Sequence, residues 1–259
     1  MSEYILFPFI LGHLKIFIVP QLEDNYTYLI PYQNKAILID PAENGLYELL
    51  KEKGLELTHV LSTHHHSDHV AANSYLQKMT GCQIIGPDDN RIPGLTKRVK
   101  DQESFSIGPF TFEVIATPGH TKSHVVYLLE TVAFTGDTLF GAGCGRIFEG
   151  SYEEMFSSLE KLCLLHDDTL IFCGHEYTEK NLRFAISLDK ENKALKQRYE
   201  ETKLLAKKKM PSVPFSLKVE KATNPFLKAA TPLERESDDT ANLDALNAFK
   251  TLRKARDLY

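Results

Sequence analysis

The sequence predicts a mixed α/β fold in which strands alternate with helices. Three runs rich in β-branched and aromatic residues, at 14–19, 26–30 and 36–39, predict strands that end at turn residues. Two segments that each end at or near a glycine, 46–53 and 71–79, predict helices. Strands with helices between them are typical of sheets covered by outer helices, so the pattern alone predicts a mixed α/β fold.

The middle of the chain continues this pattern. Residues 106–115 predict a hairpin that turns at Gly108-Pro109, and residues 125–129 predict a further strand. Ser151-Tyr152-Glu153-Glu154 predicts a helix start, because the serine can accept the third helical amide while the glutamate bonds back. That helix is expected to extend to about Leu165.

The composition changes after His175. Residues 178–189 and 191–209 are rich in Lys, Glu and Leu and predict helices, and a last helix is expected over 241–258. We therefore divide the chain into residues 1–175 and a small helical C-terminal domain, residues 176–259.

Composition and charge describe an ordinary globular protein. The chain has 259 residues, of which 42% are hydrophobic and 25% charged, so it can bury a sizeable core. A net charge of −5 argues against a nucleic-acid partner. The four cysteines form no C-x-x-C pair, which favours a reducing cytosol and a cytoplasmic protein.

The N-terminal apolar run, residues 5–11, does not predict a signal peptide. It is short, follows Glu3 rather than a basic segment, and lacks a small-residue cleavage pattern. No run approaches the roughly 20 apolar residues of a membrane span, so no membrane partner is expected.

One loop dominates the chemistry of the sequence. Thr63-His64-His65-His66-Ser67-Asp68-His69 follows a strand-like run and offers four potential ligands at H-x-H-x-D-H spacing. Such polar groups are costly to bury unless they are paired or bind an ion. A site with one metal takes three or four protein ligands, and further candidates lie downstream. The surplus predicts two metals.

The downstream candidates follow three more predicted strand ends. His120, Asp137 and His175 each come directly after a glycine that follows a run of β-branched or aromatic residues. The predicted ligands are thus five histidines and two aspartates. One set is His64, His66 and His120, the other is Asp68, His69 and His175, and Asp137 could bridge the two ions.

With these motifs, the chain resembles the metallo-β-lactamase superfamily, and more closely its glyoxalase II branch, the hydroxyacylglutathione hydrolases. The resemblance extends from about Leu14 to Tyr259 and includes a basic C-terminal helix. Its other marks are Asp24-Asn25-Tyr26, Thr63–His69, Thr117–Thr121, Gly136–Phe140, Ala142–Gly145, Gly174–Thr178 and Asn224-Pro225-Phe226.

The resemblance implies an αββα metallo-β-lactamase sandwich, residues 1–175, followed by the all-helical domain, which helps to bind glutathione. It implies hydrolysis of S-(2-hydroxyacyl)glutathione thioesters, such as S-lactoylglutathione to lactate and glutathione, in methylglyoxal detoxification. A hydroxide that bridges two metal ions would attack the thioester carbonyl, with Asp68 and Asp137 as catalytic residues. The expected partner is the substrate alone, and the chain is expected to be a monomer.

The metal is expected to be zinc, two ions per chain, with iron or manganese as alternatives. Imidazole and carboxylate ligands suit all three metals.

Carried over by position, the resemblance implies five residues that contact substrate: Arg146, Phe148, Tyr177, Arg253 and Arg256. The arginines could grip a carboxylate through two nitrogens. Phe148 departs from the family, which has a tyrosine there, and so lacks a phenol hydroxyl. Arg253 and Arg256 could instead belong to the solvated face of a helix.

Several other polar residues are given a structural reading. These are His65, between two ligands, Cys144, expected to be a buried inert thiol, and His13, His59, His124 and His166. Two other functions stay open. One is a mononuclear-iron glutathione persulfide dioxygenase of the same superfamily, and the other is a non-catalytic binding relative.

Overall fold

The structure is a computed structural model that describes residues 4–231 and 239–259. Within these residues the chain forms two compact units. The first contains the chain up to Ala116 together with Val125–Glu130, and the second contains Thr117–His124 and the chain from Thr131 onward. The first unit contains four of the candidate ligands, and the second contains the other three.

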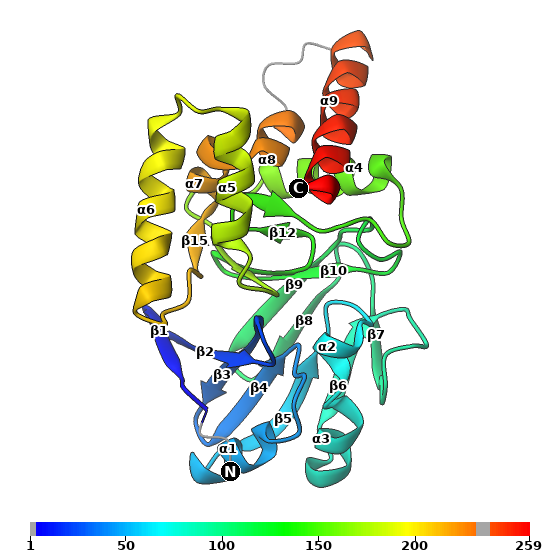
Figure 1. Cartoon of the computed structure of the whole chain (residues 1–259). Helices are drawn as coiled ribbons and strands as arrows, with labels where there is room; N and C mark the ends of the chain where they lie inside the picture. Colours follow the sequence, from blue (N-terminus) through cyan, green and yellow to red (C-terminus); the bar gives the residue numbers. More distant parts are fainter. Residues whose placement is uncertain (1–3, 232–238) are drawn as a thin grey trace. The chain divides into compact units, whose positions relative to one another are not determined.

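The first unit is built on a seven-stranded sheet in the sequence order β1 to β7 (Figure 1). Its first four strands pair antiparallel and the last three add in parallel, which places the carboxyl ends of β4, β5 and β6 at one edge. The strands are β1 Phe7–Leu11, β2 Leu14–Gln21, β3 Asn25–Tyr32, β4 Lys35–Ile39, β5 Glu56–Leu61, β6 Gln83–Pro87 and β7 Lys97–Val99. The predicted strands at 14–19, 26–30 and 36–39 are confirmed.

Helices α1 (Leu46–Glu52) and α3 (Asn73–Thr80) pack on this sheet. Their leucines join the sheet's apolar side chains in one buried cluster that includes Leu49, Leu76 and Leu38. Removing this apolar surface from water stabilises the fold by about 25 cal/mol per Å².

The predicted helix over 71–79 is wrong at its start. A single turn, α2 (Ser67–Val70), comes first, and α3 begins only at Asn73. The amide of Ala72 donates to the carbonyl of Pro41 at 3.2 Å, so it does not continue a helix from α2. Gly81 ends α3 in the left-handed region, with φ of +73°.

Three further strands complete the first unit. β8 (Ser104–Ile107) and β9 (Phe110–Ala116) form the predicted hairpin, and β10 (Val125–Leu129) pairs antiparallel with β9. The buried ring of Tyr127 donates its hydroxyl to the carbonyl of Ser62 at 3.0 Å, beside the histidine-rich loop.

The second unit contains three paired strands, a short hairpin and the C-terminal helices. β11 (Val132–Gly136) and β14 (Leu170–Cys173) are parallel, and β15 (Phe215–Ser216) pairs with β14. β12 (Leu139–Phe140) and β13 (Gly143–Cys144) form a short hairpin of their own. Helix α4 (Tyr152–Cys163) begins with the predicted capping box between Ser151 and Glu154.

The C-terminal helices follow the predicted order, with two additions. The predicted helices correspond to α5 (Thr178–Leu188), α6 (Lys193–Lys207) and α9 (Asp239–Leu258). The additions are α7 (Leu217–Thr223) and α8 (Pro225–Ala230), which begins directly after Asn224. No helix in the described parts of the chain is long and apolar enough to span a bilayer.

Candidate metal centre

The histidine-rich loop begins at the carboxyl end of strand β5. Ile39 of β4 lies opposite Leu61 of β5 in a parallel pair, so the residues after both strands reach the same edge. Asp40 follows one strand, and the loop from Thr63 follows the other. The fold thereby brings a carboxylate beside the predicted ligands.

Asp40 organises this loop and was not predicted as a site residue. Its two carboxylate oxygens accept the amide and the hydroxyl of Thr63, each at 2.7 Å. One oxygen also lies 3.0 Å from Nδ1 of His69. Asp40 is buried with φ of +53°, a region that few residues other than glycine adopt, and its own amide donates to Leu61. The only signal in the sequence is its place directly after a predicted strand.

The other carboxylate of the loop, Asp68, is held by Asn25. The side-chain amide of Asn25 donates to Oδ2 of Asp68 at 3.0 Å and to its carbonyl oxygen at 3.1 Å. Oδ2 of Asp68 lies 3.7 Å from Nε2 of His69. A motif that carried the family resemblance, Asp24-Asn25-Tyr26, thus has a physical function in this unit.

Asp137 and His175 of the second unit follow the parallel strands β11 and β14. Both side chains are buried, and Oδ2 of Asp137 lies 3.4 Å from Nε2 of His175. The same oxygen lies 3.4 Å from Nε2 of His120, which follows Gly119 in the loop before β10. Gly136, with φ of +45°, provides the sharp turn between β11 and Asp137.

The ring of His120 is oriented for metal binding. Its Nδ1 lies 2.7 Å from the carbonyl oxygen of Arg146, and a carbonyl only accepts, so Nδ1 carries the proton. In the neutral ring, Nε2 then presents its lone pair toward the carboxylate of Asp137. Two acceptors that face each other at 3.4 Å fit a cation between them.

His69 shows the same arrangement. Its Nδ1 donates to Asp40, which leaves Nε2 as an acceptor that faces Asp68. A histidine whose other nitrogen donates to a carboxylate or a carbonyl is the usual metal-binding form. The residues present therefore fit divalent cations.

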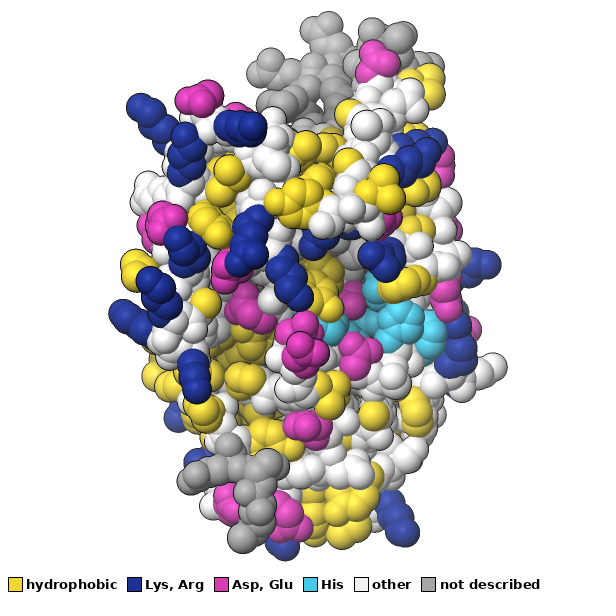
Figure 2. All heavy atoms as spheres, viewed as in Figure 1, with side chains coloured by type: hydrophobic (Ala, Val, Ile, Leu, Met, Phe, Trp, Pro, Cys, Tyr) yellow, Lys and Arg dark blue, Asp and Glu magenta, His cyan; other side chains and the backbone are white. Residues whose placement is uncertain are grey.

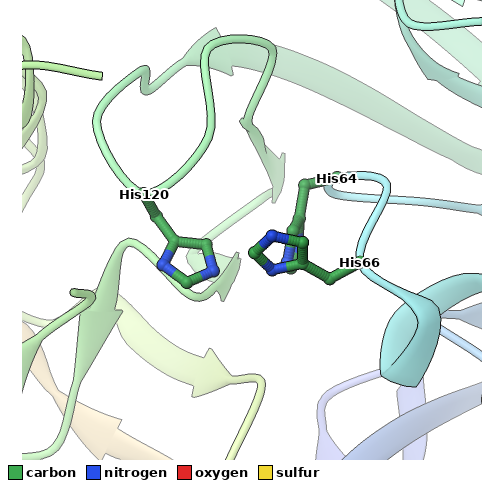
Figure 3. Close-up of side chains that lie close together, drawn as sticks. All are labelled: His64, His66 and His120. Carbon is green, nitrogen blue, oxygen red and sulfur yellow. The ribbon is translucent and has the colours of Figure 1, made fainter. Parts of the chain in front are cut away.

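The predicted ligands form three overlapping groups, and within each group the ligand atoms lie within 4.8 Å of one another. Figure 3 shows one group, in which three imidazoles point toward a common space. On the face drawn in Figure 2, histidine side chains gather with acidic side chains beside them. The groups are His64, His66 and His120; Asp68, His69 and His175; and His64, His69 and Asp137.

Two histidines close to the ligands have other contacts. His65 lies 3.4 Å from Asp89, through its Nδ1. His124 is buried, and its Nε2 accepts the backbone amide of Asp137 at 3.1 Å. The hydroxyl oxygen of Thr117 lies 2.9 Å from Nδ1 of His124. His124 thus supports the chain at Asp137, which agrees with its structural reading.

Two of the predicted substrate residues are exposed beside His120. The ring of Phe148 is 60% exposed and meets the ring of His120 edge-on, with centroids 5.3 Å apart. The guanidinium of Arg146 lies 5.9 Å from the centroid of Phe148. Both side chains are accessible to a ligand.

Tyr177 packs against another candidate ligand. Its ring stacks on the imidazole of His175, with centroids 4.7 Å apart and planes only 4° apart. The ring is half-buried, so one part packs while another faces outward.

The arginines of α9 differ in exposure. Arg253 is buried, donating to the carbonyl of Cys144 at 2.8 Å and to Asp257 at 2.9 Å. Arg256 is half-buried and donates to Asn181. Burial lowers the pKa of Arg256, and the neighbouring Arg253 lowers it further. Asp257 also accepts from Arg146 at 3.2 Å, so two guanidiniums bond this carboxylate while Arg256 lies within its electrostatic influence.

Cys144 agrees with its reading as an inert thiol. It is buried, and burial raises the pKa of the thiol, although the guanidinium of Arg253 opposes that shift. All four cysteines are buried.

Comparison with models of known protein families identifies the class of protein to which the chain belongs. The family model of the metallo-beta-lactamase superfamily matches residues 21–175, and the model described as "Hydroxyacylglutathione hydrolase C-terminus" matches residues 176–259. A solved structure, ETHE1 from Myxococcus xanthus, is 25% identical with a TM-score of 0.62, over 94% of this chain and 99% of its own.

Relatives of known name are closer in sequence. Hydroxyacylglutathione hydrolase from Methylococcus capsulatus is 42% identical over 95% of this chain and 99% of its own length. The enzyme of the same name from Brucella anthropi is 42% identical over 93% of this chain and 99% of its own. The chain therefore belongs to the hydroxyacylglutathione hydrolase family of the metallo-β-lactamase superfamily.

The family and the fold predicted from the sequence are confirmed. The fold is a metallo-β-lactamase domain of sheets and helices followed by a helical C-terminal region. The cluster of histidines and aspartates fits divalent metal ions.

Proposed function

We propose that this protein hydrolyses S-(2-hydroxyacyl)glutathione thioesters, and that S-lactoylglutathione gives lactate and glutathione. The observation that carries the proposal is the 42% identity to a hydroxyacylglutathione hydrolase, together with a C-terminus that matches the model of that family. One water is consumed, the bond between the carbonyl carbon and sulfur breaks, and glutathione leaves as a thiolate. Thiols have pKa values near 8.5, so this leaving group needs no strong acid.

Two divalent ions are proposed, most simply zinc. One would be held by His64, His66 and His120 and the other by Asp68, His69 and His175, with Asp137 as a ligand shared by both. When bound, they would lower the pKa of water to about 7 and so supply a nucleophile at neutral pH. The protein's own contribution is orientation. Asp40 and the carbonyl of Arg146 hold the rings of His69 and His120, while Asn25 holds Asp68.

Glutathione recognition is proposed for Arg146, Arg256 and Tyr177, with Phe148 beside them. Three guanidiniums against the single carboxylate of Asp257 leave a net positive charge, which suits the carboxylates of glutathione. Arg253 is buried and already bonded to Cys144 and Asp257, so it is proposed to contribute its positive charge. Residues 176–259 are accordingly proposed as the glutathione-binding domain and residues 1–175 as the catalytic domain.

A panel of substrates tests this proposal. We expect fast hydrolysis of S-lactoylglutathione and slow hydrolysis of S-lactoylcysteamine, which carries the same thioester but lacks the carboxylates. Equal kcat/KM for the two would contradict glutathione recognition.

The persulfide dioxygenase is a weaker candidate, because the relatives named hydroxyacylglutathione hydrolase are more similar than the ETHE1 structure is. Oxygen uptake on glutathione persulfide by the iron-loaded protein, without thioester hydrolysis, would favour it. A non-catalytic relative is disfavoured because all seven predicted ligands fall within the three groups. A monomeric state, a cytoplasmic location and the lack of nucleic-acid or membrane partners stay predictions from the sequence.

A further inference from the structure

The hairpin of β12 and β13 is held by side chains from four separate places in the C-terminal helices. Each of four consecutive hairpin residues, 141–144, has one backbone group bonded to one of these side chains. The bonds are Asn181 to Gly141 O (3.1 Å), Ala142 N to Glu220 (2.9 Å), Asn224 to Gly143 O (3.0 Å) and Arg253 to Cys144 O (2.8 Å).

Two of these side chains, Glu220 and Asn224, are fully buried. Glu220 forms an ion pair with the buried Arg198, and its other oxygen also accepts from Asn224 at 2.9 Å. The side-chain oxygen of Asn224 caps α8 by accepting the backbone amide of Phe226 at 3.0 Å. Burying an ion pair costs desolvation that its attraction only partly offsets, so such a network is weak support for a purely stabilising role.

The backbone at Ala142 shows what the network imposes. Its φ is +53°, which is costly for a residue with a side chain unless its surroundings fix it. The carboxylate of Glu220 accepts the amide of this residue, and Asn224 binds the carbonyl of the next one. The hairpin conformation is therefore set from the helices.

The hairpin leads directly to a predicted metal ligand. The amide of Gly145 donates to the carbonyl of Thr138 at 3.2 Å, and the carbonyl of Arg146 accepts from Nδ1 of His120. Gly145 is packed so closely that a Cβ there would lie 2.0 Å from the carbonyl oxygen of Asp137. A shift of the hairpin would thus move the acceptor that orients His120.

We propose that Glu220 and Asn224 are positioning residues of the candidate active site. They act through the hairpin on Gly145 and Arg146, and through Arg146 on the ring of His120. The proposal rests on the proposed function, because it takes His120 as a metal ligand. It also gives the Asn-Pro-Phe motif a role, since the side-chain oxygen of Asn224 caps α8 while its side-chain nitrogen donates to Gly143.

The test compares the same substitution at two helix caps. Asn224→Ser keeps an acceptor for the cap of α8, but it removes the side-chain NH2 group that donates to Gly143 O and to Glu220. Asn192→Ser is the matched control, because Asn192 caps α6 by accepting the amide of Leu195 at 3.1 Å. Both variants and the natural protein are stripped of metal and titrated with Zn²⁺ alone against a chromophoric chelator, and the hydrogen exchange of the Gly145 amide is followed.

We expect Asn224→Ser to weaken zinc binding about 10-fold, as losses of such supporting contacts do, and to speed exchange at Gly145. The control should change neither. Unchanged zinc affinity and unchanged exchange in folded Asn224→Ser would overturn the proposal, as would equal effects in both variants. If Asn224→Ser does not fold, Glu220→Gln, which keeps shape and an acceptor, is judged by the same two readouts.

Neither readout depends on the substrate. Failure of the natural protein to hydrolyse a thioester would count against the proposed function, while the zinc and exchange results would still decide the positioning roles. With an active enzyme, Asn224→Ser should lower kcat more than it raises KM, because His120 serves the reaction rather than glutathione binding.

Discussion

Nδ1 of His69 lies 3.0 Å from a carboxylate oxygen of Asp40, and both side chains are buried. The same carboxylate holds the amide and hydroxyl of Thr63, at the start of the loop that carries four predicted ligands. One side chain thus fixes both the loop and the direction in which a ligand faces.

Replacing Asp40 should therefore affect metal binding even though Asp40 is not itself in any group of candidate ligands. We expect Asp40→Asn to weaken zinc affinity by about 10- to 100-fold, because the amide still accepts a hydrogen bond but lacks the charge. Asp40→Ala should in addition lower the free energy of unfolding by about 1–3 kcal/mol, since it leaves the buried amide of Thr63 without its acceptor. Zinc titration and urea unfolding measure the two effects, and wild-type zinc affinity in Asp40→Asn would contradict the assignment.

Gly145 should tolerate no side chain. A Cβ there would lie 2.0 Å from the carbonyl oxygen of Asp137 and 3.2 Å from Nδ1 of His120. We expect Gly145→Ala to lower the unfolding free energy by about 1–3 kcal/mol and to weaken metal binding. Gly54→Ala is the control, because its Cβ would meet no atom of the described chain within 4 Å, although φ is +65°. Equal zinc affinities for the two variants would show that the close packing at Gly145 is unrelated to the site.

Phe148→Tyr should improve glutathione recognition. The ring is exposed beside Arg146, and the hydroxyl typical of the family is missing. One hydrogen bond contributes about 0.5–1.5 kcal/mol, so we expect KM for S-lactoylglutathione to fall about 2- to 10-fold with little change in kcat. Phe17→Tyr adds the same hydroxyl to a half-buried ring in β2 and should leave KM as it is. An unchanged KM in Phe148→Tyr would mean that this chain binds glutathione without a contact at position 148.

Stability should depend on pH through His59. Burial lowers the pKa of this histidine, so the folded state favours its neutral form, while the unfolded chain takes up a proton below about pH 6.5. The contribution of neutral His59 is present above that pH and is lost as pH falls toward the folded-state pKa. Urea unfolding at pH 7.5 and pH 5.5, with metal removed, should show a larger loss in the natural protein than in His59→Gln. Parallel pH profiles for the two proteins would refute this role.

The predicted ligands were accessible from the sequence because their signal is local. Each follows a strand-like run within a few residues, and glycines mark the turns before His120, Asp137 and His175. β4 pairs in parallel with β5, and β11 pairs in parallel with β14, so within each pair the residues after the two strands lie side by side. The capping box at Ser151 was predictable for the same reason.

The supporting contacts were not predictable, because nothing local distinguishes them. Asp40 looks like an ordinary turn residue before Pro41, and only the folded sheet brings it to His69, 29 positions away. Asn224 binds Gly143 from a distance of 81 positions. The break before α3 likewise depends on the hydrogen bond from the Ala72 amide to the Pro41 carbonyl. Helix propensities describe local sequence and cannot predict such a contact.

The central claim is metal-dependent hydrolysis of a glutathione thioester, and its most direct test is the rate of thioester loss. S-lactoylglutathione is mixed with zinc-loaded protein, with protein stripped by a chelator, and with stripped protein to which Zn²⁺ has been restored. We expect fast turnover in the first, almost none in the second, and recovery in the third. Turnover that survives complete removal of metal, or no turnover by protein with two ions bound, would contradict the account.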